Sequence, residues 1–202
     1  METAVSELPP AVKKNCLVNG RDYHFKKTGV NQYKINFSIK NELQFSLENN
    51  FNNVKFYSFL FSINSELVEM FEIINQTDNS IDFFILLKPI GKQMGIKQKY
   101  LLLNVETSKA EDDIFIINGK TQEDMIIKTH VAKLSIFKKD LEQVVCKYLN
   151  LSMCEKEKCI NLNLEYEINT DEEDLPIFLK NMFGTMIKNM FLKLKLFIEN
   201  RT

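Results

Sequence analysis

The sequence predicts a mainly β fold: an antiparallel β-sandwich with one short internal helix, followed by a C-terminal amphipathic helix and a strand. Three observations carry this prediction. Short segments in which apolar and polar residues alternate recur at spacings of roughly 10–20 residues. Turn-forming pairs such as Asp78-Asn79 and Asn118-Gly119 separate them. A strong helical period appears only after Thr170, so helices contribute little to the body of the domain.

Composition and charge narrow the classes of function. The chain has 202 residues, 45% hydrophobic and 26% charged, which is enough apolar material for a packed core. Lys and Arg number 26 and Asp and Glu 27, so the net charge is −1 and no overall field attracts nucleic acid or an anionic membrane. Residues 1–16 contain no apolar run, so we expect no export signal, reduced thiols and an intracellular protein of the nucleus or cytoplasm.

The first elements follow from local patterns. Residues 1–21 are polar and include two consecutive prolines, which predicts a flexible leader. Apolar residues alternate from Tyr33 to Ile39, which predicts a half-buried strand. Phe45 and Leu47 indicate a short second strand, and the alternation of Phe59, Phe61 and Ile63 indicates a third.

The remaining strands are predicted from the same two-residue period. They are Val68–Ile74, Ile81–Leu87, Tyr100–Val105, Ile114–Ile117, Val131–Ile136 and Ile160–Ile168. In the last of these, every apolar residue points to one face. Many strands with few helices between them favour a sandwich over 22–169.

Two helices are predicted. Residues 138–148 carry apolar side chains at helical spacing, although consecutive valines have low helix propensity. Residues 174–189 follow a capping-box spacing from Thr170 to Glu173, and Pro176 fits the first turn of a helix. Residues 191–199 return to a two-residue period and predict a strand.

Catalytic and metal chemistry find little support. The four residues between Cys154 and Cys159 would suit a zinc site, but the only histidines are His24 and His130, and no second closely spaced pair exists. Neither histidine has a nucleophile or a paired carboxylate at a suggestive position, and no Gly-rich phosphate loop occurs. We therefore expect no metal, no cofactor and no enzymatic activity.

The strand order resembles the MATH (TRAF-like) domain of speckle-type POZ proteins over about 22–168. The opening strand of that family usually reads aromatic-x-x-x-Trp-x-Ile-x-Asn, and residues 33–41 (YKINFSIKN) have this form with Phe37 in the Trp position. Residues 54–63, 83–87, 99–105, 133–141 and 160–168 are similar to later elements of the family. One departure is that the chain contains no Trp.

The resemblance implies a site for an extended peptide of a client protein on the sandwich face. Carried over by position, the peptide-binding residues are Phe84, Tyr100, Thr129, His130, Val131 and Lys133. Val131 and Lys133 fall near a Trp and a Phe of the family, so an acidic or phosphorylated segment could replace the usual Ser/Thr-rich one. The alternative is that Phe84, Tyr100 and Val131 are core residues.

Residues 170–202 resemble a linker and the start of a BTB/POZ domain, the dimerising and cullin-binding domain of the same family. The resemblance implies a partner or dimer helix presenting Phe178, Met182 and Met186, although this helix could instead fold back on the sandwich. The likeness stops after one helix and one strand, so we expect no cullin binding. The leading hypothesis is a substrate receptor or adaptor in ubiquitin transfer. The alternatives are an oligomerising TRAF-like module and a small-ligand-binding β fold with an enclosed apolar cavity.

Overall fold

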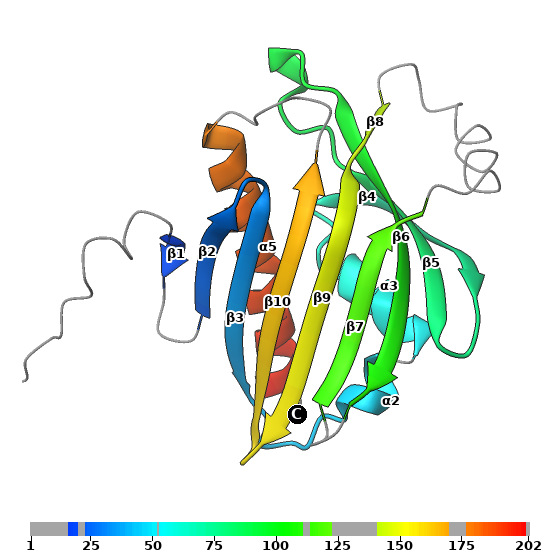
Figure 1. The fold of residues 1–202 in the computed structure, drawn as a ribbon, viewed down its shortest axis with the longest axis vertical. Helices are drawn as coiled ribbons and strands as arrows, with labels where there is room; N and C mark the ends of the chain where they lie inside the picture. Colours follow the sequence, from blue (N-terminus) through cyan, green and yellow to red (C-terminus); the bar gives the residue numbers. More distant parts are fainter. Residues whose placement is uncertain are drawn as a thin grey trace, which may run out of the picture.

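An antiparallel sheet organises the protein, as the computed structural model shows (Figure 1). The structure describes residues 16–19, 23–51, 53–110, 114–122, 141–169 and 177–200. Within them, ten strands form one continuous sheet in the order β1-β2-β3-β10-β9-β7-β6-β5-β4, with β8 paired in parallel to β6. The mainly β prediction is therefore confirmed. The sandwich is wrong, because the strands make one curved layer rather than two stacked ones.

The strands have the following bounds: β1 Cys16–Asn19, β2 Tyr23–Gly29, β3 Gln32–Lys40, β4 Val68–Gln76, β5 Ser80–Leu87, β6 Gln98–Lys109, β7 Ile114–Thr121, β8 Leu141–Gln143, β9 Val145–Lys156 and β10 Cys159–Asn169. The helices are α2 Leu47–Phe51, α3 Val54–Ser62, the short 3-10 turn η1 Lys92–Met94 and α5 Ile177–Glu199.

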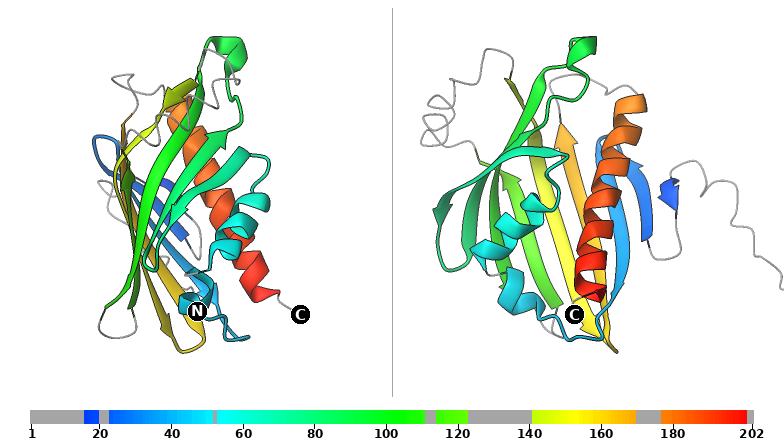
Figure 2. Two further views of the ribbon diagram at one scale, coloured as in Figure 1. Left: turned by 90° about the vertical axis from the view of Figure 1, so that its right-hand side faces the viewer. Right: turned by 180° about the vertical axis from the view of Figure 1, so that it is seen from behind.

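All the longer helices lie on one side of the sheet. Figure 2 shows α5 running along the concave side beside β3, with α2 and α3 on the same side next to the later strands. We call this side the inner face and the opposite side the outer face. The core lies between the inner face and these helices, and residues from the last turns of α5, such as Phe191 and Ile198, belong to it.

Strand alternation divides side chains between the two faces. On β3, Tyr33, Ile35, Phe37 and Ile39 are buried, while the residues between them are more exposed. The predicted strands over 33–39 and 160–168 are confirmed, and they pair directly, with Leu162 opposite Phe37.

Two predicted strands are absent because asparagines start other structures. The buried Asn41 side chain accepts from the Phe45 backbone N–H at 2.7 Å and donates to the Phe45 carbonyl at 3.1 Å, which closes a turn in place of the strand at 45–47. Residues 54–62 form helix α3. Asn53 caps it by accepting from the Lys55 N–H at 2.9 Å.

Two further elements differ from expectation. Residues 141–148 lie in β8 and β9 rather than in a helix, because β9 is paired on both sides, with β10 and with β7. Residues 191–199 are not a strand but the last turns of α5, where Phe191, Leu194 and Ile198 are buried at helical spacing. The strand predicted over 131–136 lies outside the described residues. Of the leader, 16–19 form β1, and a domain boundary at 169/170 stays a prediction.

Candidate functional site

The inner face is lined by aromatic rings where α5 covers it. Phe191 of α5 lies 5.6 Å from Phe37 of β3 between ring centroids, and Phe197 lies 4.3 Å from Phe59 of α3. These contacts join segments far apart in the sequence, and they make a continuous apolar interior between sheet and helices. Because these rings pack against one another, a molecule that binds among them must displace α5 or the rings.

Helix α3 adds one polar atom to this interior. The ring of Tyr57 lies 5.0 Å from that of Phe83 on β5, with Phe51 and Phe56 also in contact range. The Tyr57 hydroxyl is buried and has no hydrogen-bond partner among the described residues. Burial raises the pKa of this phenol far above its ordinary value, so the group is a neutral hydroxyl.

A second group of buried titratable residues lies where β3, β10 and β9 meet. The rings of Tyr33 and Tyr166 stack at 5.3 Å. Desolvation is the main reason that the pKa of Tyr166 is raised well above its ordinary value. Desolvation likewise raises the pKa of the Cys146 thiol to about 11. A thiol held in this protonated form is a poor nucleophile.

An ion pair lies on the inner face at the start of β6. Strand alternation places Lys99 on the same face as Leu101 and Leu103, and its Nζ is 2.6 Å from Oε1 of Glu142 on β8. Only 7% of the Lys99 side chain and 10% of the Glu142 side chain are exposed. The pair therefore brings two charges, but no net charge, to the interior.

Four polar contacts among the described residues hold α5 on the sheet and on the segment that follows α3. Lys193 Nζ donates to the Ile63 carbonyl at 2.8 Å and to the Glu66 carboxylate. The Glu199 carboxylate accepts from the Lys40 backbone N–H at 3.0 Å. Lys188 Nζ lies 5.0 Å above the ring of Tyr23. Each contact must break if α5 lifts away from the inner face.

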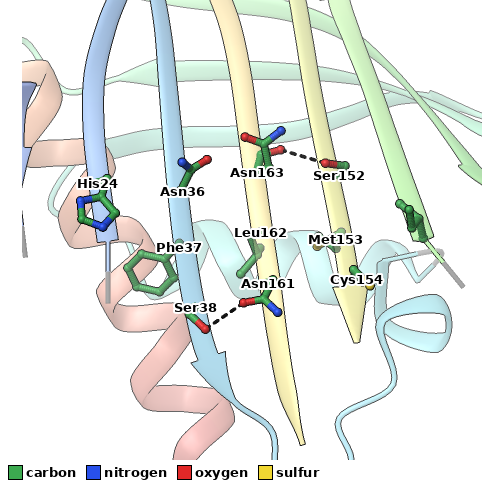
Figure 3. Close-up of a pocket in the computed structure, with 11 residues that line it drawn as sticks. His24, Asn36, Phe37, Ser38, Ser152, Met153, Cys154, Asn161, Leu162 and Asn163 are labelled. Carbon is green, nitrogen blue, oxygen red and sulfur yellow. Dashed lines mark hydrogen bonds between the residues drawn. The ribbon is translucent and has the colours of Figure 1, made fainter. Parts of the chain in front are cut away.

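The outer face carries a shallow depression of about 590 Å³ across β2, β3, β10, β9 and β7 (Figure 3). Its polar lining consists of His24, Asn36, Ser38, Ser152, Cys154, Asn161 and Asn163. Ser38 Oγ donates to Asn161 Oδ1 at 3.0 Å, and Ser152 Oγ donates to the Asn163 carbonyl at 3.4 Å. Phe37, Leu162 and Met153 also border the depression, but they are buried, and alternation directs their side chains to the inner face.

Of the six residues predicted from the sequence to bind a peptide, the structure describes Phe84 and Tyr100. Phe84 is 1% exposed and packs with Leu86 and Leu102, whereas the half-buried Tyr100 lies 6.0 Å from the Phe84 ring. This small cluster lies on the outer face of β5 and β6, so strand β5 is buried on both faces. Thr129, His130, Val131 and Lys133 lie outside the described residues.

The structure describes the predicted C-terminal helix only in part. Phe178, Met182 and Met186 lie in α5, but the side chains of this part of the helix lie outside the described residues. Among the residues that the structure describes, no group of three His, Cys, Asp or Glu side chains lies close enough to hold a metal ion. Within the same part of the chain, no helix is long and apolar enough to cross a membrane.

Sequence reasoning missed Tyr57, Lys99 and Glu142. Tyr57 was missed because the segment 54–63 was interpreted as a strand, so its buried helical face was not recognised. Lys99 and Glu142 are separated by 43 positions, and only the parallel pairing of β6 and β8 joins them. A lysine inside an otherwise apolar strand was the one local signal.

Solved structures with a similar fold are StAR-related lipid transfer domains. Human StAR-related lipid transfer protein 5 matches with a TM-score of 0.65 and 15% identity, covering 88% of this chain and 82% of its own. The human StarD13 lipid transfer and protein localization domain matches at 0.59 and 10% identity, covering 89% and 82%. A STAR-related lipid transfer protein fragment from Xanthomonas axonopodis matches at 0.55 and 11% identity, covering 90% and 94%. No protein-family model and no curated protein sequence matches the chain.

These similarities overturn the resemblance drawn from the sequence. The fold is that of StAR-related lipid transfer domains and not of a MATH or TRAF-like sandwich. The peptide-receptor function, the ubiquitin-adaptor role and the client-protein partner are therefore wrong. The error arose because the two-residue period predicts strands but does not predict whether they form one sheet or two. The findings agree better with the alternative of a β fold that binds a small ligand.

Proposed function

We propose that this chain is a non-enzymatic carrier that binds a lipid or another small, largely apolar molecule between the inner face of the sheet and α5. The observation that carries the proposal is the arrangement of one curved sheet with a C-terminal helix across its concave side, shared with lipid transfer domains over nearly nine-tenths of the chain. The aromatic interior suits such a ligand, because burying apolar surface stabilises the complex by roughly 25 cal/mol per Å².

The depression on the outer face is a weaker candidate for an apolar ligand. It is shallow and open, so a ligand lying in it would keep much of its surface in water, even though apolar atoms supply most of its exposed lining. A pocket for a drug-sized apolar molecule usually buries most of the ligand surface among apolar side chains. The inner face offers that environment once α5 moves.

The absence of Trp from the sequence allows a direct test. A Phe191→Trp variant places a single indole at the buried face of α5, whereas Leu196→Trp places one at a position of the same helix that is 57% exposed. Titration with a fluorescent fatty alcohol should quench the indole of the first variant far more strongly. Equal response of both variants, or no binding to either variant or to the unmodified protein, would contradict the proposal.

Native mass spectrometry of the unmodified protein provides a second measurement. Protein purified from cells and extracted with organic solvent should release a lipid-sized molecule in an amount comparable to the protein. Refilling the stripped protein from vesicles should restore the bound mass. If stripped protein takes up nothing from vesicles of neutral or anionic lipids, the carrier function is excluded.

A further inference from the structure

Tyr57 is placed where a phenylalanine would fit the surroundings better. Its side chain is 5% exposed, and its ring neighbours are the phenylalanines Phe51, Phe56 and Phe83. A buried hydroxyl without a partner destabilises a folded protein, because the group loses its hydrogen bonds to water and gains none in return. No described residue offers the Tyr57 hydroxyl a hydrogen bond that would offset this loss.

A second unpartnered oxygen follows on the same segment. Asn64 is 1% exposed and lies seven positions after Tyr57, just beyond the end of α3. Its amide nitrogen donates to the Leu60 carbonyl at 2.8 Å, but its Oδ1 accepts from no described residue. Both residues are therefore buried, Tyr57 within α3 and Asn64 in the turn that follows it.

The charges of the interior restrict what could satisfy these atoms. Of the described buried residues on the inner face, Lys99 is the one cation, and Glu142 already neutralises it. A ligand with a charged head group would therefore meet no free counter-ion there, and burying it would carry a large desolvation cost. A neutral hydroxyl or carbonyl group costs much less to desolvate than a charge, and it can bond to a tyrosine hydroxyl that both donates and accepts.

We propose that Tyr57 is a specificity-determining residue that receives the hydroxyl or carbonyl group of a neutral, otherwise apolar ligand. This inference rests on the proposed carrier function and adds the chemical class of the ligand. In the unliganded protein no described residue pairs with the Tyr57 hydroxyl, and in the proposed complex the ligand pairs with it. The hydroxyl thus favours ligands that bring a hydrogen-bonding group over those that bring only hydrocarbon.

The test compares three ligands of equal chain length: dodecan-1-ol, dodecane and dodecanoate. Each competes with a bound fluorescent fatty alcohol in the unmodified protein, in Tyr57→Phe and in the control Tyr148→Phe, whose side chain is 38% exposed. We expect the unmodified protein and the control to prefer the alcohol over the alkane by about tenfold. In Tyr57→Phe this preference should disappear, with alkane binding unchanged.

Thermal unfolding of the unliganded proteins distinguishes a ligand-binding role of the Tyr57 hydroxyl from a purely structural one. Loss of an unsatisfied hydroxyl should raise the Tm of Tyr57→Phe by about 2–4 °C. A lower Tm would mean that the hydroxyl is already satisfied in the free protein, and it would overturn the inference.

The binding outcomes separate this inference from the carrier function. If the unmodified protein binds alcohol and alkane equally, if Tyr57→Phe keeps the preference, or if dodecanoate binds best, the role of Tyr57 is wrong while the carrier function stands. If the fluorescent alcohol does not bind to the unmodified protein at all, the carrier function and the inference fail together.

Discussion

Two ion pairs, one buried and one partly exposed, show how burial changes the effect of removing a charge. Lys99 and Glu142 are both nearly excluded from water, and their 2.6 Å contact offsets part of the cost of desolvating two charges, although neither contacting atom makes a hydrogen bond to a described residue. The Lys34–Glu165 pair on the outer face is as short, at 2.5 Å, but 28% and 44% of its side chains are exposed. The two pairs have nearly the same separation in different surroundings, so they form a matched comparison.

Removing one partner of the buried pair should be far more damaging than removing one of the exposed pair. Lys99→Met leaves the Glu142 carboxylate buried and uncompensated, and it should lower the free energy of unfolding by about 3–5 kcal/mol. Lys34→Met should change it by less than about 1 kcal/mol, because solvent screens that pair. Urea denaturation monitored by circular dichroism measures both.

The double variant Lys99→Met with Glu142→Leu separates a charge effect from a packing effect. Replacing both charges by apolar groups of similar volume should restore stability to within about 1 kcal/mol of the unmodified protein. A double variant as unstable as Lys99→Met alone would show that lost packing, and not the stranded carboxylate, causes the damage.

Among the elements, α5 has the contacts expected of a movable cover. Its apolar residues bury themselves on the inner face, but its described polar attachments to other elements are few. The bond between Lys193 and Glu66 is exposed and joins α5 to the segment after α3. Such a bond contributes little to global stability but can influence how often the helix opens locally.

Lys193→Met should therefore loosen α5 without unfolding the protein. Hydrogen exchange followed by mass spectrometry should show faster exchange in peptides from residues 177–199, and bound ligand should leave several-fold faster. Lys55→Met, the same substitution at an exposed position of α3, is the control and should change neither rate. If Lys193→Met and Lys55→Met show the same exchange and ligand release rates, the bond between Lys193 and Glu66 does not control the opening of α5.

The same contact predicts a dependence on pH. The hydrogen bond from Lys193 is the main reason that the pKa of Glu66 is held below its ordinary value of 4.5. A lowered folded-state pKa means that the bond stabilises docking above the unfolded pKa and is lost as pH falls through the folded one. The protection of amides in 177–199, measured relative to their intrinsic exchange rate at each pH, should thus decrease in the unmodified protein as pH falls below the ordinary pKa of Glu66, and Glu66→Gln should weaken this decrease.

Some helices and strands could be predicted from the sequence, and others could not. Strands such as 33–39 and 160–168 were predictable, because one buried face forces strict alternation. The segment 54–62 was not, since its aromatic and aliphatic residues fit a strand as well as a helix, and the Asn53 cap decides between them. Residues 191–199 fit both periods, and burial at 191, 194 and 198 selects the helix.

The site was less predictable than the strands. Alternation places Phe84 and Tyr100 on one face of their strands, but it does not say whether that face is covered, and Phe84 proved to be buried. The interior beneath α5 joins β3, α3 and the C-terminal helix, whose residues meet only through the tertiary fold. No local pattern could have brought Phe37, Phe59 and Phe191 together.

At the scale of the whole molecule, one sheet separates two candidate binding regions. The apolar interior lies on its inner face under α3 and α5, and the polar depression lies on its outer face. The three helices all cover the inner face, as Figure 2 shows. Their backbone amides therefore report on a ligand in the interior and not on one in the depression.

This separation gives the last prediction. Saturating the protein with dodecan-1-ol should slow hydrogen exchange in α3 and α5, because a ligand bound to the native state stabilises the elements that enclose it. Binding should persist in Asn36→Ala and Asn163→Ala, which remove two amides of the depression but nothing from the interior. If protection instead appeared only in β2, β3, β9 and β10, and those two variants abolished binding, the ligand would lie on the outer face. Helix α5 would then be a permanent part of the core and not a cover, because lifting it would expose the rings of the interior to water and give no contact with the ligand.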